Sequence, residues 1–566
     1  MTDPQRTEYD AIVVGSGITG GWAAKELCER GLRTLVVERG RAVEHGHYPT
    51  EWLAPWEFAH RGRGDRERYA RDYPVQSKNY AFGEATEHFF VNDREHAYVT
   101  PPDQPFRWIR GYQLGGRSLI WGRVVWRWSD LDFEANRRDG HGTDWPVRYR
   151  DLEPWYAHVE RFAGVSGNRD GIPHLPDGEF LPPWAMNCAE DFVRQGIERA
   201  FPGRRMIVTR VVNLTRDHEG RTRCQARNQC ARGCSYGAYF SALSATLPAA
   251  RRTGRLTVVT DAVAEQVLYD ARRNRAAGVR VVDAHTLERR EYRARLVFLC
   301  ASAFGTVQLL LNSRSAAFPD GLANSSGVLG RYVMDHHSKA GARARVPGFE
   351  DRDVYGRRPA GTYVPRFRNL GAPNDGRAGF LRGYGLQGGA GRAGWARGAS
   401  AAGLGAELKA RLREPGPWEM TLQGYGECLP DARNHLALDP ARADRWGIPL
   451  LHVNVAWREN ERAMRRDIQT AAAELLEAAG CRDVRTYDDD GPPGFSVHEM
   501  GGARMGRDPR TSVLNAHNQA HDVPNLFVTD GACMASNSCV NPSLTYMALT
   551  ARAAHRAADL LDRREL

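Results

Sequence analysis

The strongest constraint on the fold lies at the start of the chain. An apolar run, Tyr9 to Val14, leads into the turn Gly15-Ser16-Gly17-Ile18-Thr19-Gly20 and then a stretch with helical spacing, 21–30. A second apolar run, Thr34 to Val37, ends at Glu38. Strand, glycine turn, helix, strand and acid in this order are typical of a dinucleotide-binding βαβ unit. The sequence therefore predicts an α/β fold with a Rossmann-like domain.

Each glycine of this unit, and its terminal acid, has a physical role. Gly15 permits the sharp turn, Gly17 lets the backbone approach a pyrophosphate, and Gly20 lets helix and strand pack closely. The helix N-terminus offers free N–H groups to the phosphates, and Glu38 can accept hydrogen bonds from ribose hydroxyls. The unit alone does not separate NAD from FAD. Its place at the start of a long chain, with no second glycine triplet of the same quality, favours FAD.

Composition excludes several classes of protein. The 566 residues are 42% hydrophobic and 26% charged, which indicates a globular chain of at least two domains. The net charge of +10 comes almost entirely from arginine, and no dense basic arm suggests nucleic-acid binding. No apolar run approaches the ~18–20 residues of a membrane span, and we expect no secretion signal in this chain.

Later segments are expected to return to the first sheet. These are the strands 256–259 and 264–268 around the turn Asp261-Ala262-Val263, the strand 296–300, the strand 525–531 and a helix over 544–561. The Gly-rich stretch 370–405 lacks periodicity and is predicted partly as a loop, either over the site or on the plain surface. We therefore expect an FAD-binding domain over 1–340 with interleaved segments, a substrate domain over 341–480, and a return to the first domain over 481–566.

Several motifs together resemble the glucose–methanol–choline (GMC) oxidoreductases over essentially the whole chain. They are the βαβ unit, Gly115-Gly116-Arg117-Ser118, 301–305, 330–336, and His498 with Asn541-Pro542-Ser543-Leu544-Thr545. The resemblance implies a mostly parallel FAD-binding sheet and a substrate domain built on an antiparallel sheet. It also implies cofactor contacts at Gly115, Gly116, Ser118, Val263, Asp530, Gly531 and Pro542. Segments 21–27 and 380–385 are similar to the bacterial sugar dehydrogenase branch, in particular to catalytic subunits of glucoside 3-dehydrogenases.

The resemblance identifies a catalytic pair. His498 matches the base that takes the alcohol proton while hydride passes to flavin N5, and imidazole has a suitable pKa. Asn541 matches the second position, where an amide orients the reacting oxygen but cannot take a proton. Ile120 stands before Trp121 where family members with covalent FAD have a His, so we expect non-covalent FAD. The pair His336-His337 is expected in a helix with a structural role.

Three cysteines stand apart from the other seven. Cys224, Cys230 and Cys234 have the spacing C-x5-C-x3-C. Thiolates on one tight loop suit an iron–sulfur cluster, and a zinc site would need a fourth ligand that the spacing does not supply. Similar loops occur in GMC sugar dehydrogenases that carry a [3Fe–4S] cluster, and the alternative is a metal-free loop.

The leading functional prediction is an FAD-dependent dehydrogenase acting on C3 of a pyranoside. A sugar or C-glycoside oxidase using O2, a flavin-containing lyase of the same fold, and a non-enzymatic flavoprotein remain alternatives. The resemblance implies a small partner subunit that carries the export signal and a c-type cytochrome as acceptor. We therefore expect a periplasmic protein exported with its partner, with the cytoplasm as the alternative. The sequence does not predict the oligomeric state.

Overall fold

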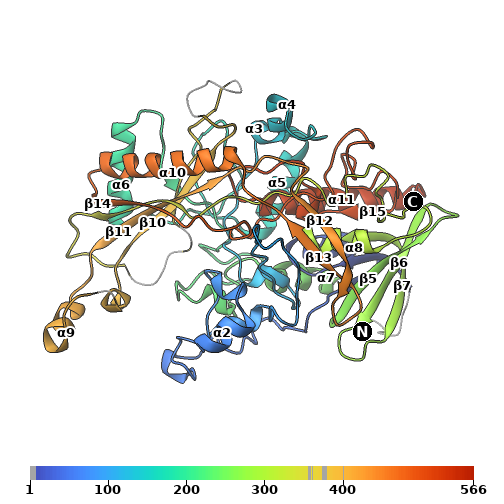
Figure 1. The fold of residues 1–566 in the computed structure, drawn as a ribbon, viewed down its shortest axis with the longest axis horizontal. Helices are drawn as coiled ribbons and strands as arrows, with labels where there is room; N and C mark the ends of the chain where they lie inside the picture. Colours follow the sequence, from blue (N-terminus) through green and yellow to red (C-terminus); the bar gives the residue numbers. More distant parts are fainter. Residues whose placement is uncertain (1–7, 355–358, 360, 372–378, 400) are drawn as a thin grey trace.

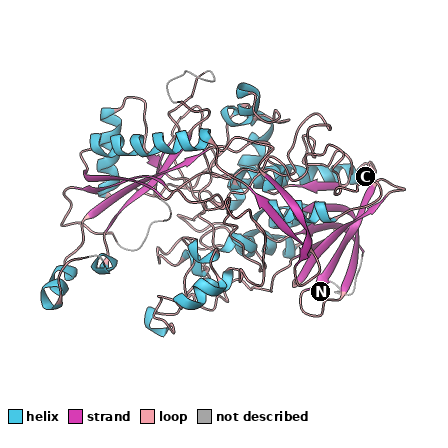
Figure 2. Cartoon of the chain, viewed as in Figure 1, coloured by secondary structure: helices cyan, strands magenta, loops and turns pink. Residues whose placement is uncertain are grey.

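The computed structural model describes residues 8–566 except 355–358, 360, 372–378 and 400. Two sheets lie at opposite ends of the molecule, and both chain termini lie in the half that contains β5, β6 and β7 (Figure 1). Figure 2 shows the two groups of strands separated by helices and long loops. The molecule therefore has two halves, each built on a β-sheet, joined by helices and long loops.

The first sheet is mostly parallel. Its parallel part has the order β4 (Leu256–Val259), β2 (Thr34–Val37), β1 (Glu8–Val14) and β7 (Arg289–Leu299), and β15 (Leu526–Val528) also pairs with β7. Two antiparallel strands, β6 (Arg275–Asp283) and β5 (Ala262–Asp270), extend it beyond β7. The apolar parallel strands are buried, as expected where helices cover both faces of a sheet. The predicted α/β fold class is confirmed.

Helices from distant parts of the chain cover this sheet. They are α1 (Ile18–Glu29), α5 (Tyr149–Ala163), α7 (Leu247–Arg252), α8 (Ala303–Asn312) and α11 (Ser543–Asp562). α1 contacts both α7 and α11, and α11 also contacts α5. The predicted turn over 261–263 is wrong in part, because β5 already begins at Ala262 and Val263 lies within it. Asp261 alone has the left-handed backbone, with φ +54°.

The second sheet is antiparallel and takes its strands from three stretches of the chain. Its order is β14 (Arg482–Asp488), β8 (Ala340–Val346), β11 (Trp418–Gly426), β10 (Tyr384–Arg392), β9 (Thr362–Val364) and β3 (Ile207–Val208). α10 (Glu459–Ala478) and α6 (Cys188–Ala200) cover one face, where Leu422 and Ala342 pack near Ile468. The domain limits at 340 and 480 stay predictions, although β3 and β14 belong to this sheet and lie outside them.

The loop predicted over 370–405 is wrong where β10 forms. β10 lies inside the sheet, hydrogen-bonded to β11 on one side and β9 on the other. A side chain at Gly388 would overlap the carbonyl oxygen of Thr421, so the close approach of the backbones requires glycine there. Glycines of this kind remove the alternation from which a strand is predicted. Residues 372–378 and 400 of that stretch lie outside the described part.

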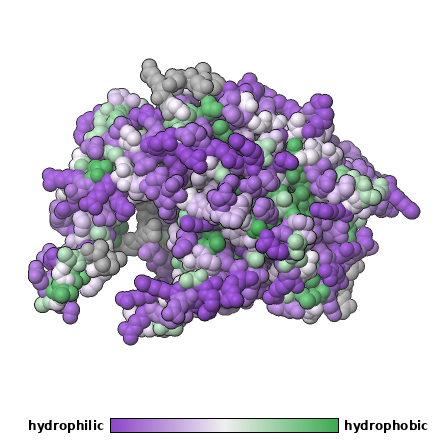
Figure 3. Space-filling model, in the orientation of Figure 1, coloured by the Kyte–Doolittle hydropathy of each residue, from purple (hydrophilic) through white to green (hydrophobic). Residues whose placement is uncertain are grey.

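The remaining elements are short or peripheral. They are α2 (Arg66–Asp72), α3 (Asp130–Phe133), α4 (Ala135–Asp139), α9 (Gly405–Arg413) and the hairpin β12 (His435–Ala443) with β13 (Pro449–Asn454). No helix among the described residues has the length and apolar character needed to cross a bilayer. The visible surface is mainly hydrophilic, with small apolar areas (Figure 3).

Candidate functional site

A cavity of about 510 Å³ runs from the carboxyl edge of the parallel sheet to the antiparallel sheet. Its lining includes Gly15, Gly17, Glu38, Gly116, Ser118, Val263, Asp530, Gly531, His498 and Asn541, all of them predicted site residues. Gly20, Gly115 and Pro542 are not part of the lining. The cavity therefore brings one end of the βαβ unit and the predicted catalytic pair into one continuous space.

The glycine turn is shaped by contacts that exclude side chains. Gly15 has φ +94°, and a Cβ there would overlap the carbonyl oxygen of Cys300. A Cβ on Gly20 would overlap the carbonyl oxygen of Gly15, which explains the close packing of helix and turn. Gly17 differs, because a Cβ there would meet nothing within 4 Å. Its backbone therefore borders open space at the N-terminus of α1, where a pyrophosphate can approach.

Glu38 is held in place at the end of β2. Its Oε2 accepts hydrogen bonds from the backbone N–H (3.1 Å) and Oγ–H (2.5 Å) of Ser16, and its Oε1 accepts one from Gly40 (2.9 Å). Burial raises the pKa of the Glu38 carboxyl, although these hydrogen bonds oppose the shift. The side chain is thus oriented before any ribose hydroxyl reaches it.

The second glycine turn packs directly against the first. Gly115 has φ +90° and donates its N–H to Ser16 Oγ at 2.9 Å. A Cβ on Gly116 would lie 3.5 Å from the Gly17 Cα. Ser118 Oγ accepts a hydrogen bond from Ala242 N–H at 3.0 Å and donates to the Gly115 carbonyl. The two turns therefore form one continuous wall, to which Gly17, Gly116 and Ser118 contribute cavity lining.

Asp530 and Gly531 close the cavity near the start of α11. Asp530 Oδ2 accepts a hydrogen bond from Thr306 Oγ1 (2.5 Å), and its Oδ1 accepts one from Ala532 N–H (2.9 Å). Burial raises the pKa of this carboxyl to about 6. Pro542 lies immediately before α11, in the position where a ring without an N–H is tolerated.

The predicted catalytic pair is in contact. Asn541 Nδ2 lies 3.4 Å from His498 Nε2. Two partners that the sequence did not indicate flank the pair. Gln387 of β10 donates from Nε2 to Asn541 Oδ1 at 2.7 Å, and His336 Nδ1 lies 2.8 Å from His498 Nδ1. The pair therefore sits in a row of four side chains that joins both halves of the molecule.

The hydrogens of this row can be assigned from its ends. His336 Nε2 contacts the carbonyl oxygen of Ser538, which can only accept, so Nε2 carries the proton of a neutral His336. His336 Nδ1 then has a lone pair and accepts from His498 Nδ1–H. His498 Nε2 is consequently unprotonated, and it accepts from the amide of Asn541. Gln387 fixes the same amide orientation independently, because its N–H occupies the Asn541 carbonyl oxygen.

Burial keeps both imidazoles neutral. It lowers the pKa of His336 to about 4. The pKa of His498 lies well below 6.5, first because of burial and then because of His336 and the Arg117 guanidinium. His498 is therefore neutral at pH 7, with an unprotonated Nε2 beside the Asn541 amide.

The segment around His336 corrects two predictions. Residues 331–339 form isolated bridges and turns and no helix, and His336 contacts the base rather than serving structure alone. Asp335 accepts hydrogen bonds from Ser496 Oγ–H and from the backbone N–H groups of Gly494 and His498. Burial, with the nearby Glu499 carboxylate, raises the Asp335 pKa to about 7. Because His336 and His498 are 162 residues apart, no local spacing could have revealed their contact.

The three cysteines lie on one loop around a small pocket. Cys224, Cys230 and Cys234 all line it, and Ala226 and Asn228 between them have left-handed backbones. Their sulfur atoms are not all within 4.8 Å of one another. This arrangement is wider than a single-ion site and is compatible with a larger group that has one thiolate at each corner.

Among the described residues, one group has three possible metal ligands within 4.8 Å, namely Glu26, His158 and His555. Glu26 Oε1 accepts from His158 Nε2 at 2.8 Å, and Oε2 from His555 Nε2 at 2.9 Å. The Lys25 ammonium lies 3.1 Å from the same carboxylate. The group is fully hydrogen-bonded and joins α1, α5 and α11, so we interpret it as structural.

The fold and the cavity are those of a dinucleotide-binding protein in which a buried, neutral histidine borders the cavity. Sequence models of the GMC oxidoreductase family match residues 9–337 and 430–550. The chain therefore belongs to this family, and it is an FAD-dependent oxidoreductase that acts on CH–OH groups.

Relatives match over nearly the full chain. The 2-methyl-1,2-propanediol dehydrogenase of Mycolicibacterium austroafricanum is 30% identical, over 98% of this chain and 97% of the relative. The fructose dehydrogenase large subunit of Gluconobacter japonicus is 27% identical over 96% and 97%. Paromamine 6'-oxidase of Streptomyces fradiae is 26% identical over 98% and 92%.

The solved structure of pyridoxine 4-oxidase from Mesorbium loti is similar in fold, with a TM-score of 0.62 and 18% identity over 97% of this chain and 98% of that one. These comparisons extend the resemblance seen in the sequence to the whole fold.

Proposed function

We propose that the protein is an FAD-dependent dehydrogenase that oxidises a sugar or glycoside hydroxyl, at C3 of a pyranoside, to a ketone. The observation that carries the proposal is the unprotonated Nε2 of His498, which faces the cavity beside the Asn541 amide. Relatives named for fructose and paromamine support a sugar as substrate. The choice of C3 rests on the resemblance of 21–27 and 380–385 to glucoside 3-dehydrogenases.

The side chains account for the proton transfer in alcohol oxidation. Alcohol oxidation removes a proton from oxygen and a hydride from carbon. His498 Nε2 accepts the proton, and Asn541 Nδ2 donates a hydrogen bond to the same oxygen and orients the carbinol carbon. FAD, when bound along Gly15, Gly17 and Glu38, supplies the hydride acceptor at N5. The residues present fit the cofactor, because Gly17 borders open space and the cavity lining includes Gly15, Glu38 and Gly116.

Anaerobic mixing with methyl glucosides tests this proposal. We expect the flavin absorbance to bleach, the product to be the 3-keto glycoside, and His498→Ala to slow bleaching strongly without loss of FAD. Fast peroxide release in air would favour the oxidase alternative. Bleaching by small 1,2-diols but by no glycoside would instead favour a diol as substrate, as in the name of the related 2-methyl-1,2-propanediol dehydrogenase.

We further propose that Cys224, Cys230 and Cys234 hold a [3Fe–4S] cluster. Such a cluster would supply one-electron transfer toward a protein acceptor, whereas an oxidase would not need it. Iron analysis and EPR of the purified protein test this. We expect Cys230→Ser to lose iron and the EPR signal, whereas Cys188→Ser, a matched partly buried cysteine outside the loop, retains both. Absence of iron in the unmodified protein would refute the cluster.

The partner proposal follows from the same resemblance. We propose a small subunit that carries the export signal, a c-type cytochrome acceptor and a periplasmic location, with the cytoplasm as the alternative. The relative from Gluconobacter japonicus is named as a large subunit, which supports an assembly of this kind. Purification of the protein from its native cells, with identification of any co-purifying small subunit and cell fractionation, tests both points.

A further inference from the structure

The antiparallel sheet has one buried face and one open face. Leu422 and Ala342 are fully buried against the α10 side. Their neighbours along the strands, Gln423 and Arg343, point to the other face because successive side chains alternate. The open face is therefore a polar surface within the half of the molecule that contacts Asn541.

Four exposed arginines occupy the outer strands of this face. Arg343 of β8 lies directly opposite Arg485 of β14, and Arg345 lies opposite Arg482. Within the described part of the chain, none of the four makes an ion pair or a side-chain hydrogen bond. Glu419 of β11 is in register with Arg345, but the two side chains form no ion pair. Like charges directly opposite on neighbouring strands destabilise a sheet. Two such pairs side by side form a positive surface that an anion can neutralise.

The contrast with the opposite face supports this reading. Arg465 of α10 forms an ion pair with Asp488 of β14, and Arg368 pairs with Asp467 of α10. Other arginines in this half of the molecule thus have acidic partners, whereas the four arginines of the open face do not. The Arg343 guanidinium lies 5.5 Å from the centre of the Tyr487 ring, which restricts its position without neutralising its charge.

The arginines lie near the catalytic cavity on the same sheet face, although none of them lines it. Gln387 lines the cavity and is in register with Gln423, which is in register with Gly341 beside Tyr487. The arginines begin one row further out, two residues along the strands. With strands ~4.8 Å apart and a rise of ~3.3 Å per residue, the Arg343 Cα lies about 12 Å from the Gln387 Cα. A long arginine side chain can therefore meet the part of a substrate just outside the oxidised ring.

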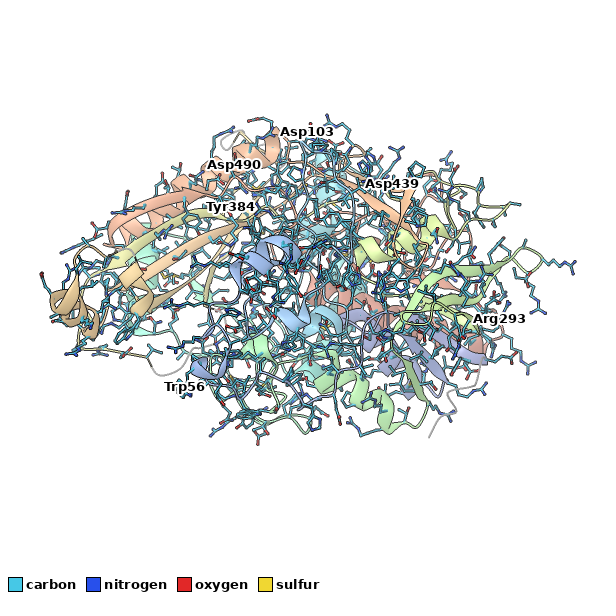
Figure 4. All side chains as sticks on the ribbon, turned by 60° about the horizontal axis from the view of Figure 1, so that its bottom comes forward. Trp56, Asp103, Arg293, Tyr384, Asp439 and Asp490 are labelled. Atoms are coloured by element: carbon cyan, nitrogen blue, oxygen red, sulfur yellow. The ribbon has the colours of Figure 1, made fainter. Side chains whose placement is uncertain are left out.

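We propose that this arginine face, Arg343, Arg345, Arg482 and Arg485, binds a carboxylate, sulfate or phosphate on the unit next to the oxidised sugar. The substrate class is then an anionic glycoside, and this inference rests on the proposed sugar dehydrogenase function. Guanidinium groups suit carboxylate and phosphate oxygens because their N–H groups match them in pairs. Figure 4 shows Tyr384 of β10 and Asp490, just after β14, in the left half of the view, and Arg293 at the right.

Two matched disaccharides test the inference in the holoenzyme. Cellobiose is neutral, and cellobionate carries a carboxylate on the unit next to its glucose. At low salt, we expect kcat/KM for anaerobic flavin reduction to be about tenfold higher with cellobionate than with cellobiose, because KM is lower. This difference should shrink above ~0.5 M salt, where the charges are screened. Arg343→Gln with Arg485→Gln should remove the advantage and leave cellobiose unchanged. Glucose 1-phosphate against methyl glucoside repeats the test for phosphate.

Arg290→Gln with Arg293→Gln is the control, because it removes two exposed charges from β7 at the other end of the molecule. Equal kcat/KM values for cellobiose and cellobionate in the unmodified enzyme, with no effect of the Arg343 and Arg485 changes, would overturn the inference. That result differs from failure of the proposed function, in which no glycoside would bleach the flavin at all.

Discussion

The two sheets have different roles, and the glycines discussed above lie at different places in them. In the first sheet, the parallel strands are apolar and buried, and Gly15 and Gly17 lie in the turn after β1, where a ligand can approach the backbone. In the antiparallel sheet, one face is buried under α10, the other is polar, and Gly388 lies inside a strand because another strand approaches it. The first sheet binds a common cofactor through its backbone, and the second presents side chains that can differ between relatives. The catalytic row joins them.

The largest expected effect concerns the junction of the two sheets. His498→Ala should slow flavin reduction by roughly 10²–10⁴-fold, because a positioned base is removed. The FAD spectrum and content should stay unchanged, since the FAD-binding glycine turns are untouched. Rapid anaerobic kinetics measure the effect. A rate close to that of the unmodified enzyme would mean that the base lies elsewhere in the cavity.

Next in size is the turn of the parallel sheet. Gly15→Ala should weaken FAD binding at least tenfold, because it adds a clash with Cys300 to a left-handed backbone that already costs about 1–2 kcal/mol. Gly31→Ala is the matched control, with φ +87° and no atom within 4 Å of the added Cβ. FAD content after gel filtration compares the two. If both variants retain FAD equally, the Cys300 contact is not what shapes the cofactor turn.

A pH profile sharpens the role of the row between the sheets. His336→Gln should lower the rate about tenfold and move the acid limb of kcat/KM to higher pH, because His336 helps to keep the pKa of His498 low. The sign follows from the lowered pKa: His498 stays unprotonated above it and loses its base function only as pH falls through it. His337→Gln, an adjacent buried histidine, should leave the acid limb in place, and a shift of equal size there would contradict the assignment.

The smallest effect is expected within the antiparallel sheet. Gly388→Ala should lower the free energy of unfolding by about 2 kcal/mol through overlap with Thr421. It should alter KM for the substrate more than FAD content. Gly391→Ala on the same strand, where the added Cβ meets nothing within 4 Å, is the control. Thermal unfolding followed by circular dichroism compares them, and identical melting curves would show that β10 tolerates the extra atom.

The same contrast explains what the sequence could predict. The βαβ unit was predictable because Gly15, Gly20 and Glu38 follow one another within a short stretch, each with a backbone or hydrogen-bonding reason. His498 and Asn541 were found by resemblance, and the structure brings them together. Gln387 and His336 had no signal, because each meets the pair only through tertiary folding. β10 was missed because its glycines, of which Gly388 is required by a neighbouring backbone, break the alternation that marks a strand.

The row from Gln387 to Ser538 also has a direction. Every hydrogen in it points the same way, and the row ends on a backbone carbonyl that cannot accept a proton covalently. The proton that His498 takes from the substrate therefore has no onward route through His336 into the protein. In the proposed reaction, the proton therefore returns to solvent on the cavity side of His498. The chain of hydrogen bonds acts as a one-sided support for the base, which it orients without draining its proton into the protein.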